Sequence, residues 1–289
     1  MKTDVQPWHP NSSDGGIVMF QNQSAFNHPS SGSSISSTKH YHDTIARMDR
    51  AIAAAPYDSD LWVNKGYAFY GLGKTQEAIA SFNEALKQFP ENARALHGKG
   101  LCWAKLTRYK DAIACFQKAL ELDPNDGQLW YNQGTAYNRL ELPKEAIDSF
   151  DQAIALRPKD HRAWFNRAVA LGALHRYRAA LENLNVAVEI KPDCYYAWNY
   201  RGFTLTRLKQ FDEAIDSFNR ALTHESHNPS AWFGKAKVLA IQGHFNESLD
   251  SLYRTFVLSP YLYRVIAQTD SDFDRLSDHP RFKKLIRGQ

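Results

Sequence analysis

One residue pattern recurs six times in this chain at a constant interval of 34 residues. Each copy opens on a bulky residue, carries a small residue four positions later, and in five copies closes on proline. The opening residues are Trp62, Leu96, Trp130, Trp164, Trp198 and Trp232. A fixed period of this length indicates stacked supersecondary units that pack on their neighbours, and it argues against a single globular core.

The spacing of the apolar residues inside each copy predicts two helices. In the third copy, Trp130, Gly134 and Tyr137 lie at i, i+4 and i+7, which places them on one buried stripe of a helix. A small residue is expected at the Gly134 position because a neighbouring helix approaches too closely for a larger side chain. The closing prolines end the second helix of each copy. In the first copy we therefore expect a first helix over 61–71 and a second over 75–88.

The period and the Trp, Gly, Ala, Phe, Ala and Pro positions resemble those of the tetratricopeptide repeat (TPR) family over residues 59–260. The resemblance implies an all-α fold, a right-handed α-solenoid superhelix built from six tandem antiparallel helix pairs. It also implies that the chain binds peptides or proteins in a concave groove and acts as an adaptor or scaffold, not as an enzyme.

The N-terminal part departs from the repeat. Residues 1–38 contain nine serines and only three charged residues, so this segment is predicted to be a disordered tail. Residues 39–58 are predicted to be a half-repeat capping helix, with helical spacing from about Tyr41 to Ala55.

Residues 261–289 are predicted to form C-terminal capping helices. Phe273, Leu276, Phe282 and Leu285 are expected to cover the end of the last helix pair. Asp278 followed by Pro280 predicts the cap and the start of a final short helix.

Composition places the chain among soluble cytoplasmic proteins. The net charge of +4 is well short of the excess typical of nucleic-acid-binding proteins. No apolar run is long enough for membrane insertion, and the first 20 residues do not resemble a secretory signal. The three cysteines include no CxxC spacing, which favours a reducing compartment.

A second stripe of each first helix is predicted to form the partner-binding groove. Its residues are Tyr67, Arg94, His97, Tyr131, Arg139, Arg162, Phe165, Tyr196, Phe203, Arg207, Phe233 and Lys237. Aromatic and arginine side chains most often anchor interfaces, and the cations of this stripe are expected to face a single acid, Asp60. The predicted partner is therefore a protein or peptide with acidic and apolar residues. The alternative is that several of these rings only pack against adjacent repeats.

Two other binding modes stay open. The alternative function is RNA binding by a row of basic residues, each three positions after the opening residue of its repeat, because a line of cations can follow the phosphates of a nucleic acid. The same side chains can instead pack along their stems and place only the charged end in water. The row consists of Lys65, Lys99, Gln133, Arg167, Arg201 and Lys235. A regulatory variant is that the N-terminal tail occupies the groove in cis through Trp8, Phe20 or Phe26.

No motif supports catalysis, a cofactor, a small-molecule substrate or a metal. G-x-x-x-x-G-K, G-x-S-x-G and H-E-x-x-H are all absent from the sequence. His224 and His227 lie three residues apart, but no third metal ligand accompanies them. The lysine and asparagine set with which TPR co-chaperones hold acidic C-termini is also missing, which argues against that form of peptide recognition.

Overall fold

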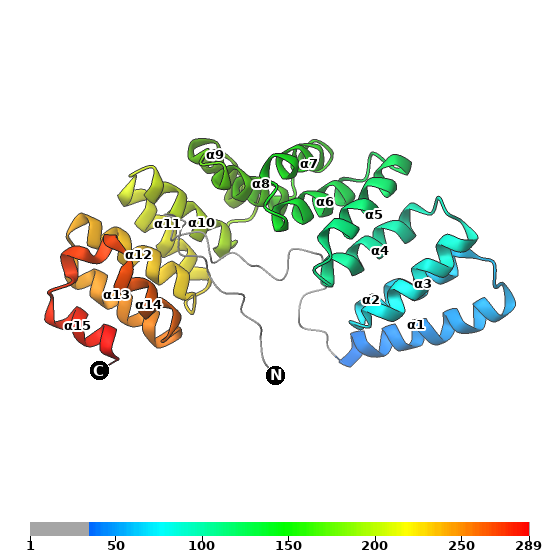
Figure 1. Cartoon of the computed structure of the whole chain (residues 1–289), viewed down its shortest axis with the longest axis horizontal. Coiled ribbons are helices and arrows are strands. Elements are labelled where there is room, and N and C mark those ends of the chain that lie inside the picture. Colours follow the sequence, from blue (N-terminus) through cyan, green and yellow to red (C-terminus); the bar gives the residue numbers. More distant parts are fainter. Residues whose placement is uncertain (1–34, 289) are drawn as a thin grey trace. The chain divides into compact units, whose positions relative to one another are not determined.

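The computed structural model describes residues 35–288, with side chains from Thr38 onward. These residues form α-helices α1–α15 and one 3₁₀ helix, η1, and contain no strand (Figure 1). The all-α solenoid of tandem helix pairs expected from the repeat is therefore confirmed. The chain divides into two compact units, of which the described parts run from α1 to α9 and from α10 to α15.

Each repeat supplies one first helix and one second helix, and these pack closely on each other. The first helices are α2 (Ser59–Gly71), α4 (Ala93–Lys105), α6 (Gly127–Arg139), α8 (His161–Ala173), α10 (Tyr195–Arg207) and α12 (Pro229–Gln242). The second helices are α3 (Thr75–Gln88), α5 (Tyr109–Leu122), α7 (Pro143–Leu156), α9 (Tyr177–Ile190), α11 (Phe211–His224) and α13 (Phe245–Leu258). Within each unit the second helix also packs on the first helix of the following repeat.

In the five repeats that open on tryptophan, the indole N–H binds the backbone just after the end of the preceding helix. Trp130 Nε1 donates to the carbonyl oxygen of Pro124 at 2.8 Å, and Trp164 Nε1 donates to that of Pro158 at 2.9 Å. In the sixth repeat Trp232 Nε1 donates at 3.0 Å to Ser226, which occupies the proline position. Because the acceptor is a backbone carbonyl, serine can replace proline here without loss of the hydrogen bond.

Helix α1 (Ile35–Ala54) packs on α2 at the start of the first unit. It begins inside the segment 1–38 that was predicted to be a tail, and before Tyr41, where the helical spacing begins. Its first turns carry exposed side chains such as Lys39 and His40, so no apolar stripe marks them. Residues 1–34, with Trp8, Phe20 and Phe26, lie outside the described residues.

Helices α14 (Leu262–Thr269), η1 (Ser271–Leu276) and α15 (Pro280–Arg287) follow the last repeat. Phe273, Leu276 and Phe282 are buried in one cluster with side chains of α12 and α13, and Leu285 packs against that cluster. The expected N-cap of the final helix is wrong by one residue. His279 Nδ1 accepts from Arg281 N at 3.2 Å, whereas the Asp278 carboxylate pairs with Lys283.

Candidate partner-binding surface

The predicted groove residues project from the first helices, but they differ widely in exposure. We call the faces that carry them the first-helix surface, made by α2, α4, α6 and α8 in one unit and by α10 and α12 in the other. Arg94 and Arg207 are exposed, and Tyr131, Phe165 and Phe233 are buried. The half-buried members are Tyr67, His97, Arg139, Arg162, Tyr196, Phe203 and Lys237.

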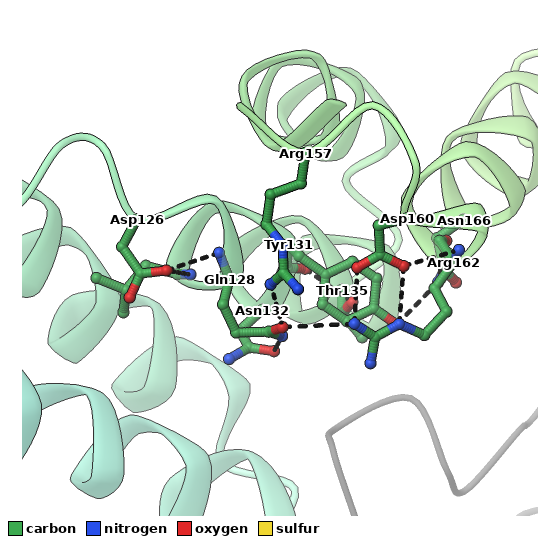
Figure 2. A network of polar contacts seen from close by, with 10 residues as sticks. Asp126, Gln128, Tyr131, Asn132, Thr135, Arg157, Asp160, Arg162 and Asn166 are labelled. Atoms are coloured by element: carbon green, nitrogen blue, oxygen red, sulfur yellow. Dashed lines mark hydrogen bonds and ion pairs between the residues drawn. The ribbon is translucent and has the colours of Figure 1, made fainter. Parts of the chain in front are cut away.

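Tyr131 lies at the centre of a polar network between α6 and α8 (Figure 2). Its ring is covered by the guanidinium of Arg162, whose Cζ lies 4.9 Å from the ring centroid. Arg162 in turn holds Asp160 with two hydrogen bonds, of 2.8 Å from Nε and 2.6 Å from Nη2. Asn166 Nδ2 donates to the Tyr131 hydroxyl at 3.2 Å. Tyr131 is therefore enclosed by the following repeat and has only 2% of its surface exposed.

The same network continues backward through two amides of α6. Arg157 Nη1 donates at 2.8 Å to Gln128 Oε1, and Gln128 Nε2 donates at 3.1 Å to Asn132 Oδ1 (Figure 2). Asn132 Nδ2 then lies 2.8 Å from His97 Nε2 on α4. Three consecutive repeats are thus joined by polar side chains on this surface.

The buried groups of the network have shifted pKa values. Burial lowers the pKa of His97, which keeps the imidazole neutral. Because an amide nitrogen can only donate, the neutral His97 Nε2 accepts from Asn132 and the ring proton lies on Nδ1. Burial raises the pKa of Tyr131 to about 12. Burial alone would raise the pKa of Asp160, but the hydrogen bonds and the charge of Arg162 outweigh it and lower that pKa.

Among the predicted groove cations of the first unit, Arg94 is the exposed one. Its guanidinium reaches back to the preceding repeat, where Nη1 lies 3.3 Å from Asp60 Oδ1 and Nη2 donates to Asn64 Oδ1 at 3.1 Å. Tyr67 lies beside it, with its hydroxyl donating to the carbonyl oxygen of Arg94 at 3.0 Å. The Tyr67 ring packs edge-on against Phe82 with centroids 5.1 Å apart.

The C-terminal segment occupies the first-helix surface of the sixth repeat. Phe233 packs against Tyr263 and Phe273, with ring centroids 5.0 and 5.6 Å apart, and only 4% of Phe233 is exposed. Lys237 Nζ lies 2.8 Å from Asp270 Oδ2 and 2.9 Å from Asp272 Oδ2. Phe233 and Lys237 therefore contact the chain's own cap.

The expectation that the cations face a single acid is wrong. Asp60 does pair with Arg94, but Asp160, Asp270 and Asp272 also pair with cations of this surface. Sequence reasoning missed Asp160 because the row was traced only along first-helix positions, whereas Asp160 is the N-cap of α8. A signal was present, since five of the six first helices have Asp or Asn at this position, namely Asp58, Asn92, Asp126, Asp160 and Asn228.

The remaining predicted rings pack within their own unit. Phe203 on α10 lies edge-on to Phe218 of the following helix, with centroids 5.1 Å apart, and Tyr196 lies edge-on to Tyr195 at 5.6 Å. Beside them Asn199 Nδ2 donates to Ser230 Oγ at 3.1 Å. Phe203 and Tyr196 are half-buried, so part of each side chain stays accessible.

Residues of the basic row considered for RNA binding form ion pairs and hydrogen bonds with second helices and with α1. Lys65 Nζ lies 2.6 Å from Asp49 Oδ1, and Arg167 Nε lies 2.6 Å from Asp151 Oδ1. Arg201 Nη1 donates to Ser217 Oγ at 2.6 Å. The Arg201 contact joins the two helices of the fifth repeat, whereas the Lys65 and Arg167 contacts reach the helix that precedes their repeat. At least three of the cations therefore have internal partners.

The described residues include no cluster of three or more potential metal ligands, and none of their helices is long and apolar enough to cross a bilayer. His224 and His227 accordingly gain no third ligand there. All three cysteines are free thiols, and burial raises the pKa of Cys102 to about 12. A thiol with that pKa is a poor nucleophile at neutral pH.

The sequence model of one family, described as Tetratricopeptide repeat, matches residues 39–93, 63–127, 104–161 and 131–193, and a second model of that description matches 195–228. No curated protein sequence matches the chain.

Solved structures share the fold. YrrB, described as a TPR protein with an unusual peptide-binding site, superposes with a TM-score of 0.55 at 23% identity over 63% of this chain and 94% of YrrB. PilF of Pseudomonas aeruginosa superposes with a TM-score of 0.64 at 14% identity over 80% of this chain and 97% of PilF. The part of MamA from Desulfovibrio magneticus RS-1 that runs from residue 41 to the end superposes with a TM-score of 0.56 at 23% identity, over 58% of this chain and 95% of that one. The helix pairs, the 34-residue period and the sequence matches agree, and the chain belongs to the tetratricopeptide repeat family.

Proposed function

We propose that this chain is a non-catalytic cytoplasmic adaptor that holds a segment of a partner protein against its first-helix surface. The observation that carries the proposal is the solvent-exposed ion pair between Arg94 and Asp60, which links two repeats. The side chain of Arg94 is 60% exposed and that of Asp60 is 65% exposed. An ion pair this exposed contributes only about 0–1 kcal/mol to stability.

A weak pair of this kind can exchange partners at little cost. A carboxylate on the bound segment would take the place of Asp60 on Arg94, and the Asn64 amide next to it offers a further polar contact. Arg162 is different, because its two short hydrogen bonds to Asp160 and its contact with Tyr131 hold it in place. We therefore place acidic recognition at Arg94 and assign Arg162 to the support of the surface.

The apolar contact is proposed for Tyr67, which lies beside Arg94 and is partly exposed. Its orientation is fixed on two sides, by the hydroxyl bond to the Arg94 carbonyl and by the edge contact with Phe82. A ring held in this way loses little conformational entropy on binding. Tyr131 and Phe165 are 2% and 5% exposed, so they support the surface from beneath.

The partner class rests on the charge and the fold. Arg94 and Tyr67 together suit a peptide segment with acidic and apolar residues, and the TPR neighbour YrrB is described as having a peptide-binding site. RNA binding is not proposed, because Lys65, Arg167 and Arg201 are already held by internal partners.

The test is a selection of displayed random peptides on the purified full chain and on two charge-reversed variants. Arg94→Glu changes the first-helix surface, and Lys118→Glu makes the same change at an exposed position of α5. We expect the native chain and Lys118→Glu to enrich peptides that combine Asp or Glu with aromatic or aliphatic residues, and Arg94→Glu to lose them. Equal enrichment by Arg94→Glu, or none by the native chain, would refute the proposal.

A further inference from the structure

Half of the large apolar side chains exposed in the described chain lie within thirteen residues of each other. They are Tyr253, Val257, Tyr261, Leu262 and Val265, and between 51% and 85% of each residue is exposed. We call these five residues the C-terminal apolar patch. Tyr253 and Val257 are one helical turn apart on α13, Tyr261 directly precedes α14, and Leu262 and Val265 lie in its first turn.

The patch is specific to the last repeat. At the positions that match Tyr253, the five earlier repeats have Asn83, Gln117, Asp151, Asn185 and Asn219. At the positions that match Val257 they have Lys87, Glu121, Ala155, Glu189 and Thr223. Nine of these ten residues are polar, so the repeat pattern itself does not call for apolar side chains here.

The fold does not use the patch. Helix α14 already buries Tyr263 and Ala267 in the C-terminal cluster, while Leu262 and Val265 point away from that cluster. Together the five residues expose on the order of 500 Å², which is near the upper end for the largest apolar patch of a typical monomer. An exposed apolar area of this size indicates an interaction site.

Two basic stretches of the chain border the patch, although Tyr253 also shares a hollow with Glu247 and Asp250. Residues 251–269 contain two arginines and no acidic residue, and residues 279–288 contain four Lys or Arg and no acidic residue. Helix α15 lies against this region, because Arg281 pairs with Asp250 on α13 and Arg264 Nε donates to the carbonyl oxygen of Leu285 at 3.1 Å. Among the described residues no carboxylate pairs with Arg254, Lys284 or Arg287.

We propose that the C-terminal apolar patch and the basic residues of α15 dock this chain on the surface of an anionic lipid bilayer. Lipid phosphates would meet Arg254, Lys284 and Arg287, while the aliphatic side chains enter the boundary of the acyl region and the two tyrosines lie at headgroup depth. The chain lies on the bilayer and does not cross it. A second copy of the chain is a poorer occupant, because it would bring the same basic residues face to face.

The experiment measures sedimentation of the full chain with vesicles of phosphatidylcholine containing about 30% phosphatidylglycerol, an anionic content that sets a strong surface potential. The patch variant is Val257→Ser, Tyr261→Ser and Val265→Ser, and the charge variant is Lys284→Gln and Arg287→Gln. A matched control, Phe89→Ser, Leu122→Ser and Leu156→Ser, removes three exposed apolar residues from other repeats. All the changed side chains are exposed, so each variant is expected to fold.

We expect the native chain and the control to bind these vesicles, and both the patch variant and the charge variant to bind about tenfold more weakly. Binding to pure phosphatidylcholine should also be about tenfold weaker, and binding should fall with added salt. Arg94→Glu should bind vesicles like the native chain, which separates this proposal from the adaptor function.

Three results would overturn the inference. The first is that the native chain fails to sediment with anionic vesicles. The second is that the patch variant sediments as well as the native chain does. The third is a concentration-dependent dimer in light scattering that disappears in the patch variant while vesicle binding is absent. That result would assign the patch to a second copy of the chain.

Discussion

Gly134 on α6 lies directly against the ring of Phe150 on α7, and a Cβ added to Gly134 would lie 2.8 Å from Phe150 Cε1. Real Cβ atoms do not approach carbon atoms this closely, so the ring requires glycine opposite it. The same contact joins Gly66 to Phe82, Gly100 to Phe116 and Gly202 to Phe218. The two repeats with alanine at this position, at Ala168 and Ala236, have the smaller Leu184 and Leu252 in place of phenylalanine.

This pairing predicts a coupled pair of substitutions. Gly134→Ala should destabilise the chain by about 2 kcal/mol, because the buried Phe150 ring cannot move away without strain. Phe150→Leu alone should also destabilise it, by about 1–2 kcal/mol, through a cavity. In the double variant the new methyl group fills that cavity, so the combined loss should fall short of the sum by about 1 kcal/mol. Urea unfolding of the four proteins measures this coupling, and strictly additive losses would contradict it.

A second prediction concerns the residue with positive φ that follows each first helix, two positions after the helix ends in five repeats and one position after it in the sixth. Gly73 and Gly243 have positive φ angles there, and so do the non-glycine residues Thr107, Glu141, His175 and Lys209. A β-branched residue is the least suited to this left-handed conformation. Thr107→Gly should therefore raise the free energy of unfolding by about 0.5–1 kcal/mol, net of the greater flexibility of glycine in the unfolded chain.

The control for Thr107→Gly is Lys118→Gly, a change at an exposed position inside helix α5. It should lower the free energy of unfolding by about 1 kcal/mol, because glycine is a poor helix former. Thermal unfolding of both variants measures whether each change raises or lowers the free energy of unfolding. A loss of stability in Thr107→Gly would show that the positive φ of Thr107 is not strained.

The third prediction is a pH dependence that originates at His97. Burial lowers the pKa of His97 below its ordinary value of 6.5, so the unfolded chain binds the proton more readily than the folded chain. The stabilisation is fully present above pH 6.5 and is lost as pH falls from there through the folded pKa. His97→Gln keeps a polar side chain that can accept from Asn132 but cannot titrate. Melting temperatures between pH 8 and pH 5 should fall less steeply for His97→Gln than for the native chain, and parallel curves would contradict the assignment.

The fourth prediction compares two ion pairs of the C-terminal cap. Asp270→Asn with Asp272→Asn leaves the mostly buried Lys237 ammonium without a counter-charge, and should lower the free energy of unfolding by about 1–3 kcal/mol. The side-chain amide introduced by Asp270→Asn can still accept the hydrogen bond that starts η1. Asp278→Asn removes a fully exposed partner from Lys283 and should leave the unfolding curve unchanged. Equal effects of the two changes would refute the role given to Lys237.

The fold could be predicted from the sequence because its period is carried by residues that the packing requires. Trp130, Gly134 and Phe150 make the contacts that define one repeat, and the same residue types stand at most of the matching positions 34 residues apart. The candidate surface could be predicted less completely from the sequence. The sequence places Tyr131 and Arg162 on first helices, but it does not show that Arg162 lies over Tyr131 and hides it. Phe233 and Lys237 follow the repeat pattern too, yet a segment beyond the last repeat covers them, and no internal period indicates that contact.

The central claim is that a partner segment exchanges with Asp60 at Arg94 on the first-helix surface. The most direct measurement is isothermal calorimetry with one selected acidic peptide and the native, Arg94→Glu and Lys118→Glu chains. The account predicts that Arg94→Glu weakens binding by about tenfold or more, a loss of about 1.4 kcal/mol, whereas Lys118→Glu binds like the native chain. Equal dissociation constants for Arg94→Glu and the native chain would contradict it.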